Sequence, residues 1–432
     1  MMFAAPESVQ PETMLPEIFI SAGEASGEHY GALLVAELTR QLSAKGQRAA
    51  YFGMGGERMS AAGLDCVVRS ENMAVMGLTE IVRHLPRIWR EFRRLKQAVR
   101  ERRPAVAVLI DFPEIHFRLA ELLHQLGIPV IFFVSPQLWA WKKKRIRLVQ
   151  KYIDKMLVIF PFEEPFYRQR GVAAEFVGHP LAELPLPVIS RADFAAANGL
   201  DPAKTWIGLL PGSRAKEIGD ILPEMLWAAR ELGAKPEEPA VKRLIPAESA
   251  TALAHEGTPL ANDFEFIVPL APTLHAEQRA VVRRLVAEHG AGLPVHLVND
   301  ARATLAHARA SVVASGTATV EAALIGNPFV VVYRVSPLTF AIAKRLVKVP
   351  FVAMANLIAG KLVVPELIQD DFKAENIVEQ IRPLLPDGQP RQSMTEELAR
   401  IHALLRKEPE SSGAIERVAE VTLEMMGSAV KD

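Results

Sequence analysis

Cysteine is nearly absent from this chain of 432 residues, because Cys66 is the only one. An intramolecular disulfide framework is therefore excluded, and a single thiol is typical of proteins from a reducing compartment. An excess of one charge is also lacking, since 50 Lys and Arg balance 50 Asp and Glu. This balance argues against a general nucleic-acid-binding protein, and we expect no nucleic acid among the partners.

A long apolar segment is missing as well. The longest nearly uncharged run lies between Arg309 and Arg334, and it is broken by Glu321, a Ser-Gly-Thr turn and a Gly-Asn-Pro turn. A membrane-spanning helix needs about 20 apolar residues without such breaks, so we predict no transmembrane segment. Residues 1–16 contain three prolines and no Lys or Arg, which predicts an extension and not a signal peptide.

Short apolar runs alternate with helical patterns from residue 17 onward. This alternation predicts an α/β protein with two Rossmann-like, doubly wound parallel-sheet domains that face a cleft. We expect an N-terminal domain over 17–182 and a C-terminal domain over 188–336, with a surface insertion at 233–263. Residues 337–432 are expected to form a helical tail that packs back on the domains. The predicted strands are Ile18–Ser21, Ala50–Gly53, Ala105–Ile110, Val130–Val134, Lys155–Ile159, Trp206–Leu210, Phe264–Val268, Val295–Leu297, Ser311–Ala314 and Phe329–Val332.

Two segments combine a small-residue turn with the start of a helix after a predicted strand, namely Gly212–Arg214 and Ser315–Thr317. Free N–H groups and the helix dipole favour phosphate at such positions, and the guanidinium of Arg214 matches phosphate oxygens. Glu321, one turn into the second helix, can reach a sugar hydroxyl. The two turns together predict a site for the phosphate and ribose of a nucleotide. The alternative is that both are ordinary turns that serve packing.

Asp111 follows the apolar run Ala105–Ile110 at the carboxyl end of a predicted strand. A carboxylate at this edge is either a helix-capping residue or a general base at a ligand site. Glu114 is the competing base, although an acidic side chain in the first turn of a helix also balances the helix dipole. The residues alone leave these alternatives open.

The segment 81–103 has the pattern of a basic amphipathic helix. This segment contains nine Lys and Arg and only two Glu, a net charge of +7, and its apolar residues recur at helical spacing. Such a helix either packs on the core and leaves its basic face in solvent, or docks on an anionic membrane surface. No D-x-D triplet or H-E-x-x-H spacing occurs anywhere in the sequence, so we expect no metal site.

Several motifs, in one order along the chain, resemble those of the lipid-A-disaccharide synthase family. They are Ser21–Glu28, Ala74–Gly77, Ser135–Trp141, Phe176–His179, Leu210–Arg214 and Ala314–Ala318. The resemblance runs from Ile18 to Leu385, and Asn356–Gly360 and Pro365–Leu367 add to it. Several motifs in one order are far more specific than any single motif.

The resemblance implies a metal-independent, inverting glycosyltransferase of the GT-B type that needs no cofactor. Its donor would be UDP-2,3-diacylglucosamine and its acceptor 2,3-diacylglucosamine 1-phosphate. The products would be the β-1,6-linked lipid A disaccharide 1-phosphate and UDP. The resemblance also implies a protein on the cytoplasmic face of the inner membrane, which binds the anionic membrane surface through the 81–103 helix. It allows a homodimer.

The resemblance further implies roles for individual residues. Asp111 would accept the proton of the acceptor's 6-hydroxyl, and Arg214 would meet the charge that grows on the departing UDP. The other substrate-binding residues would be Gly212, Ser213, Ser315, Gly316, Thr317, Glu321 and Asn356.

Some features depart from the usual family pattern. His116 stands where an asparagine is usual, and the extension 1–16 and the insertion 233–263 have no assigned role. One alternative is another GT-B enzyme that uses UDP-N-acetylglucosamine, either a peptidoglycan-type transferase or an epimerase. The other is a non-catalytic protein that binds a nucleotide sugar or lipid without turnover.

Overall fold

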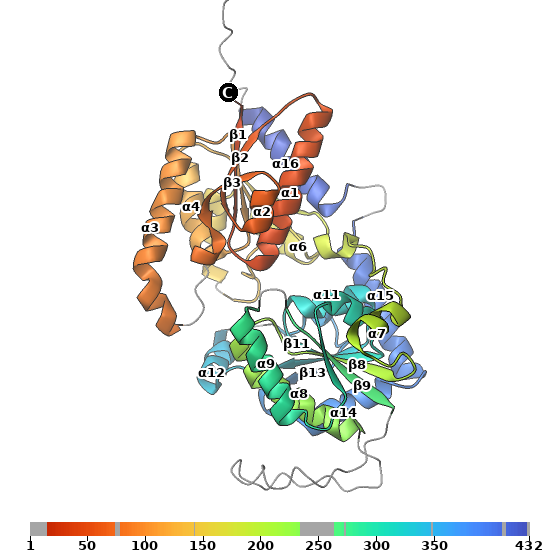
Figure 1. Ribbon diagram of the computed structural model, residues 1–432. Helices are drawn as coiled ribbons and strands as arrows, with labels where there is room; N and C mark the ends of the chain where they lie inside the picture. Colours follow the sequence, from red (N-terminus) through yellow and green to blue (C-terminus); the bar gives the residue numbers. More distant parts are fainter. Residues whose placement is uncertain are drawn as a thin grey trace, which may run out of the picture. The chain divides into compact units, whose positions relative to one another are not determined.

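The computed structural model describes residues 15–73, 78–141, 143–233, 263–271, 274–346, 349–407 and 412–429. The chain divides into two compact units. Unit 1 contains the residues up to Pro180 together with those from Lys407 onward, and unit 2 contains Leu181–Arg406. Each unit is a parallel sheet with helices on both faces, which confirms the predicted α/β class (Figure 1).

Unit 1 is built on a seven-stranded sheet with the strand order β3-β2-β1-β4-β5-β6-β7 within the described residues. The strands are β1 Glu17–Ala22, β2 Ala50–Gly55, β3 Leu64–Arg69, β4 Val106–Ile110, β5 Val130–Phe133, β6 Lys155–Val158 and β7 Ala174–Phe176. The helices are α1 Ala25–Ala44, α2 Glu57–Ala61, α3 Leu78–Arg102, α4 Pro113–Gln125, α5 Ile146–Tyr152, α6 Glu163–Arg168 and α16 Ala414–Ala429.

Alternate side chains of the central strands point to opposite faces of this sheet. Phe19 of β1 and Leu109 of β4 join a buried cluster with Leu95 of α3 and Phe117 of α4. The helices α1 and α16 lie side by side on the other face (Figure 1). Burial on both faces explains the continuous apolar runs of β1 and β4, because neither face of a covered strand needs polar residues.

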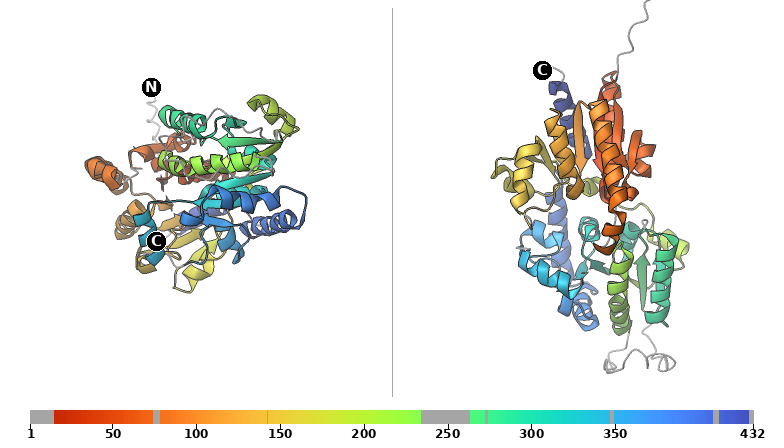
Figure 2. Two further views of the ribbon diagram at one scale, coloured as in Figure 1. Left: turned by 90° about the horizontal axis from the view of Figure 1, so that it is seen from below. Right: turned by 90° about the vertical axis from the view of Figure 1, so that its left-hand side faces the viewer.

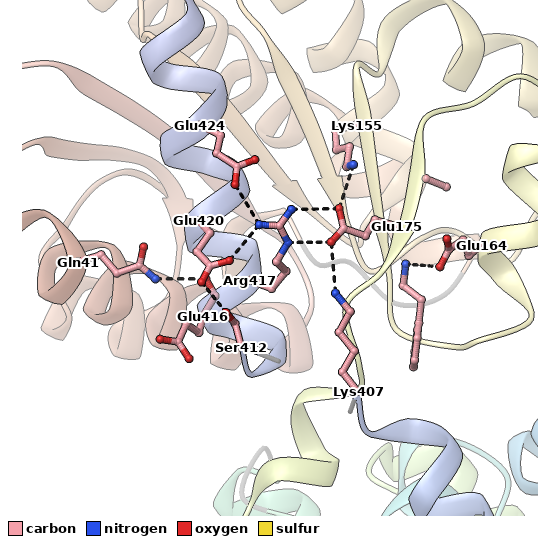
Figure 3. Close-up of polar contacts among 12 residues, drawn as sticks. Gln41, Lys155, Glu164, Glu175, Lys407, Ser412, Glu416, Arg417, Glu420 and Glu424 are labelled. Atoms are coloured by element: carbon pink, nitrogen blue, oxygen red, sulfur yellow. Dashed lines mark hydrogen bonds and ion pairs between the residues drawn. The ribbon is translucent and has the colours of Figure 1, made fainter. Parts of the chain in front are cut away.

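Helix α16 returns to unit 1 from the far end of the chain, and Arg417 anchors it there (Figure 3). The Arg417 Nε atom lies 2.7 Å from the Glu175 carboxylate of β7, and Lys155 Nζ of β6 lies 3.0 Å from the same carboxylate. Burial raises the pKa of Glu175, but hydrogen bonds from Arg417 and Lys155 outweigh it and bring the pKa to about 2. This charged cluster ties a distant segment to the sheet edge.

Unit 2 is built on a six-stranded sheet with the order β10-β9-β8-β11-β12-β13 within the described residues. The strands are β8 Thr205–Leu210, β9 Phe264–Pro269, β10 Val295–Val298, β11 Ala310–Ala314, β12 Phe329–Tyr333 and β13 Glu366–Ile368. The helices are α7 Arg191–Asn198, α8 Ala215–Gly233, α9 Ala276–His289, α10 Ala301–His307, α11 Thr317–Ile325, α12 Pro337–Leu346, α13 Met354–Ala359, α14 Ala374–Ile381 and α15 Gln389–Leu405. Helices α8 and α9 run side by side along one face (Figure 2).

The ten predicted strands are all present, with ends that differ by at most two residues. Within the described part of the chain, three further strands were not predicted, namely β3, β7 and β13. The residues expected to form a helical tail divide between the units, because 337–406 belong to unit 2 and 407–432 to unit 1. Residues 1–14 and 234–262, which include nearly all of the expected extension and insertion, lie outside the described residues.

Candidate functional site

The carboxyl edge of the unit 1 sheet carries three unusual main-chain conformations. Asp111 and Phe112 after β4 have φ values of 52° and 53°, and Val134 after β5 has a φ of 62°. Left-handed conformations are uncommon outside glycine, most of all for a β-branched residue, and cost about 1–3 kcal/mol each. Since β4 and β5 are neighbours, the three residues mark one place on the sheet. Strained residues of this kind cluster at functional sites.

The Asp111 carboxyl has an electrostatic environment suited to a general base. Burial raises its pKa, the N–H of Phe112 donates to it and lowers the pKa, and the charges of Glu24 and Glu114 raise it again. The net result is a pKa of about 6. A carboxyl with this pKa is largely ionised at neutral pH and is more basic than an ordinary aspartate.

The competing candidate, Glu114, lies in a different environment. Its side chain is 56% exposed, and its Oε1 atom lies 3.2 Å from Nη1 of Arg145. It occupies the first turn of α4, where a carboxylate favours the helix dipole. Glu114 therefore has the features of a surface charge, whereas Asp111 has those of a half-buried base with a raised pKa.

The Ser135–Trp141 segment follows the strained Val134 and is held by a buried glutamate that the sequence analysis missed. Glu163 Oε1 accepts hydrogen bonds from Ser135 Oγ at 2.6 Å and from Trp139 Nε1 at 3.0 Å. Burial raises the pKa of Glu163 to about 7, although these donors lower it. Tyr167 adds a hydrogen bond to the carbonyl of Pro136 at 3.0 Å. The only sequence signal was an acidic pair between phenylalanines.

Glycines near the start of unit 1 serve packing. A Cβ atom on Gly31 or Gly55 would lie within 2.7 Å of the Met59 sulfur, so both glycines make room for this side chain. Glu28 accepts a hydrogen bond from the N–H of Arg58 at 2.7 Å and caps α2. Glu28, Gly31 and Gly55 therefore serve the packing of α1, β2 and α2 against one another.

The predicted basic helix corresponds to α3, Leu78–Arg102. Phe92, Leu95 and Val99 are buried in the core of unit 1, so this part of the apolar face covers the sheet. Trp89 is 50% exposed, next to Arg93, whose guanidinium lies 5.9 Å from the centre of the indole ring. The side chains of residues 78–85 lie outside the described part of the chain.

The carboxyl edge of the unit 2 sheet brings the two predicted turns together. The turn Gly212–Arg214 follows β8, and Ser315–Thr317 follows the neighbouring strand β11. Gly212 has a φ of 109°, and a Cβ atom there would lie 2.4 Å from Oε2 of Glu217. Glycine is therefore required both by the conformation and by the space.

Glu217 changes the prediction for the first turn. Its carboxylate accepts the main-chain N–H groups of Ser213 and Arg214, and the Arg214 charge is close to it. Glu217 stands three residues after Arg214, where an acidic side chain caps the start of a helix. These N–H groups are consequently occupied, whereas the side chains of Ser213 and Arg214 are exposed. Tyr333, at the end of β12, belongs to the same group, since Glu217 and Arg214 both affect its pKa.

The second turn is open to a ligand. Gly316 has a φ of 154°, and Gly316 and Thr317 are exposed at the start of α11. Thr319 Oγ1 donates to the carbonyl of Gly316 at 2.7 Å and holds the turn. Glu321 lies one turn further along α11, and burial raises its pKa, although the nearby Arg302 lowers it. This edge therefore presents exposed main-chain groups, a cation and a half-buried carboxyl.

Asn356 lies in a different kind of environment from the other predicted residues. It is fully buried, and its Nδ2 atom donates to the Val364 carbonyl at 2.9 Å and to Glu366 Oε1 at 2.8 Å. Its Oδ1 atom accepts from the N–H groups of Val363 and Val364. Since all its hydrogen-bonding capacity is used, the Asn356 side chain holds this loop and has no donor or acceptor left for a ligand.

Two further properties concern metals and membranes. Among the described residues, no group of three or more His, Cys, Asp or Glu side chains could hold a metal ion. Among the same residues, no helix has the length and apolar character to cross a bilayer.

Comparisons with known proteins give one consistent family. The family model described as lipid-A-disaccharide synthetase matches residues 18–252 and 248–418. A lipid-A-disaccharide synthase from Acidobacterium capsulatum is 56% identical over 420 residues, which cover 95% of this chain and 96% of the relative. A second, from Koribacter versatilis, is 48% identical and covers 94% and 98% of the two chains.

Solved structures of similar fold have much lower identity. The calicheamicin glycosyltransferase CalG4 matches with a TM-score of 0.54 and 18% identity, over 96% of this chain and 98% of that one. A UDP-GlcNAc 2-epimerase from Neisseria meningitidis, bound to UDP-GlcNAc, matches with a TM-score of 0.56 and 14% identity, over 95% and 100%. These likenesses show the two-unit GT-B fold.

Proposed function

This chain belongs to the lipid-A-disaccharide synthase family, and we propose that it transfers 2,3-diacylglucosamine from UDP to 2,3-diacylglucosamine 1-phosphate. The products are the β-1,6-linked lipid A disaccharide 1-phosphate and UDP. The observation that carries this conclusion is the match to one family over nearly the whole chain. Its fold is shared with epimerases, but its sequence is shared with the synthases.

Asp111 acts as the general base. Its carboxylate accepts the proton of the acceptor's 6-hydroxyl while that oxygen attacks the anomeric carbon of the donor and the bond to UDP breaks. The raised pKa of about 6 and the strained main chain support Asp111 over the exposed, ion-paired Glu114. Attack from the side opposite to UDP inverts the anomeric configuration, which gives the β-linkage.

The unit 2 edge binds UDP. The guanidinium of Arg214 and the hydroxyl of Ser213 meet the charge on the departing diphosphate, together with main-chain groups of the Ser315–Thr317 turn. Gly212 keeps the first turn in the conformation that Glu217 caps. Glu321 hydrogen-bonds the ribose. Asn356 holds the 352–366 loop that completes the donor pocket.

One reaction mixture tests this function. Purified protein is incubated with the two acylated glucosamine substrates, and UDP and disaccharide are quantified in parallel. We expect equal amounts of both products. UDP release without disaccharide would favour the alternatives, as would conversion of UDP-N-acetylglucosamine to an epimer in a parallel incubation with that nucleotide sugar.

Both substrates carry acyl chains and therefore reside in a membrane. We propose that α3 docks on the anionic surface of the inner membrane, at its cytoplasmic face. The C-terminal half of its apolar face is buried in unit 1, so among the described side chains the contact would be made from the exposed side, on which Trp89, Arg90 and Arg93 lie. Co-sedimentation with vesicles of anionic lipid tests this, with Arg90→Glu and Arg93→Glu expected to abolish binding at low salt. Binding of both variants at the wild-type level would contradict it. The homodimer stays a prediction, which light scattering would check.

A further inference from the structure

A buried chain of hydrogen bonds leads from β1 to the main chain of Asp111. Ser21 and His116 are both fully buried, and Ser21 Oγ lies 2.9 Å from His116 Nε2. The other ring nitrogen, Nδ1, is hydrogen-bonded to the main-chain carbonyl of Asp111. Because a carbonyl oxygen can only accept, Nδ1 carries the proton and Nε2 accepts from the Ser21 hydroxyl. Burial lowers the pKa of His116 to about 4, so the ring is neutral at pH 7.

This chain acts on a strained part of the main chain. Asp111 and Phe112 are consecutive left-handed residues, and such a conformation persists only where the surroundings hold it. The N–H of Asp111 donates to the carbonyl of Phe133 in β5 at 2.9 Å, while its carbonyl accepts from His116 of α4. The Asp111 peptide groups are therefore held from two elements, and the direction of the carboxyl depends on both.

The same corner accounts for Gly23. A Cβ atom there would lie 2.2 Å from the Phe112 ring, so the ring of Phe112 fits only over a glycine. The His116 ring packs edge-on against Phe112, with 5.8 Å between the ring centres. At the start of the Ser21–Glu28 segment, Ser21 thus provides the hydroxyl that contacts His116, and Gly23, which has no side chain, leaves space for the Phe112 ring.

We propose that His116, oriented by Ser21, is a positioning residue that directs the Asp111 carboxyl toward the acceptor hydroxyl by holding the main-chain carbonyl of Asp111. The proposal rests on the proposed role of Asp111 as the base. It assigns a function to the side chain at position 116 without any contact between that side chain and the substrate.

Two amide substitutions separate this role from a general contribution to packing. The amide nitrogen of asparagine lies near the position of His Nδ1, so His116→Asn keeps a donor for the Asp111 carbonyl. The amide nitrogen of glutamine lies near the position of Nε2, so His116→Gln keeps a contact with Ser21, with the amide N–H now donating to the Ser21 hydroxyl, and loses the donor to the Asp111 carbonyl. We expect kcat of His116→Asn to stay within about threefold of wild type, whereas His116→Gln and His116→Leu lose ~10²-fold in kcat with little change in KM, since a base displaced by about 1 Å costs that much. His124→Leu, on the same helix, is the control and should retain full kcat.

Further variants keep the test decisive. If His116→Leu fails to fold, as thermal unfolding would show, the Asn and Gln pair decides, together with Ser21→Ala. Ser21→Ala is expected to lower kcat by about 3–10-fold because Nε2 loses its donor. Equal kcat for the Asn and Gln variants, or wild-type kcat for a folded His116→Leu, would overturn the positioning role. Asp111→Asn distinguishes a failure of the positioning role of His116 from a failure of the proposed base. Full turnover by Asp111→Asn would refute Asp111 as the base.

Discussion

The pH dependence of turnover follows from the environment of Asp111. With a pKa of about 6, the carboxyl is ionised in about one-tenth of the molecules at pH 5 and in nearly all at pH 8. Only the ionised form accepts a proton, so kcat/KM should fall about tenfold from pH 8 to pH 5. The groups that face Asp111 are Glu24, Glu114 with its partner Arg145, and the neutral His116.

The acceptor's own phosphate also titrates near pH 6, so the profile needs a second perturbation. Glu24→Gln removes a negative charge near Asp111 and should move the acid limb of kcat/KM to lower pH, whatever it does to the maximal rate. Glu101→Gln, which removes a charge from α3, should leave the limb in place. Initial rates of UDP release from pH 4.5 to 8.5, at substrate concentrations well below KM, give the three profiles. A limb that Glu24→Gln does not move would refute Asp111 as the titrating base.

The remaining predictions concern donor binding and stability. Arg214→Ala should lower kcat about 10²–10³-fold and weaken UDP binding in a calorimetric titration, because a preorganised donor to the leaving group is lost; unchanged values would exclude a contact with UDP. Glu175→Gln should lower the free energy of unfolding at pH 7 by about 1–2 kcal/mol after allowance for solvent screening. The pKa of Glu175 is lowered from 4.5 to about 2, so the difference in unfolding free energy between wild type and Glu175→Gln should shrink as the pH falls from 4.5 to 2. Urea titrations at several pH values measure this difference. The control Glu424→Gln, at an exposed side chain, should change the free energy of unfolding little at any of these pH values. Asn356→Ala should cost about 2–4 kcal/mol in the same assay, because buried N–H groups lose their acceptor, and a neutral effect would contradict the loop-shaping role.

The central strands could be predicted because burial on both faces makes them continuous apolar runs. The three missed strands, β3, β7 and β13, are all at sheet edges. An edge strand is short or half exposed, so its sequence lacks that run. In β3, for example, Asp65 and Arg69 are exposed.

The candidate site could be predicted in part for a related reason. Asp111 follows β4 in unit 1, whereas the turns Gly212–Arg214 and Ser315–Thr317 follow β8 and β11 in unit 2. All three follow recognisable strands, and the carboxyl ends of the parallel strands in each sheet share one edge. What could not be predicted depends on contacts between distant residues. Ser21 and His116 are 95 positions apart in the chain, and no local pattern indicates their hydrogen bond.

The mechanism requires that Asp111, at the edge of the unit 1 sheet, accepts the proton, whereas the edge of the unit 2 sheet binds UDP. One single-turnover measurement on Asp111→Asn tests this requirement most directly. The variant is loaded with UDP-2,3-diacylglucosamine, mixed with excess acceptor, and followed for disaccharide formation. The affinity for UDP is measured separately on unloaded protein from the same preparation. We predict wild-type affinity for UDP and a rate of disaccharide formation reduced by at least about 10³-fold. Disaccharide formation at the wild-type rate would show that the proton of the acceptor hydroxyl goes elsewhere, and the mechanism described here would be wrong.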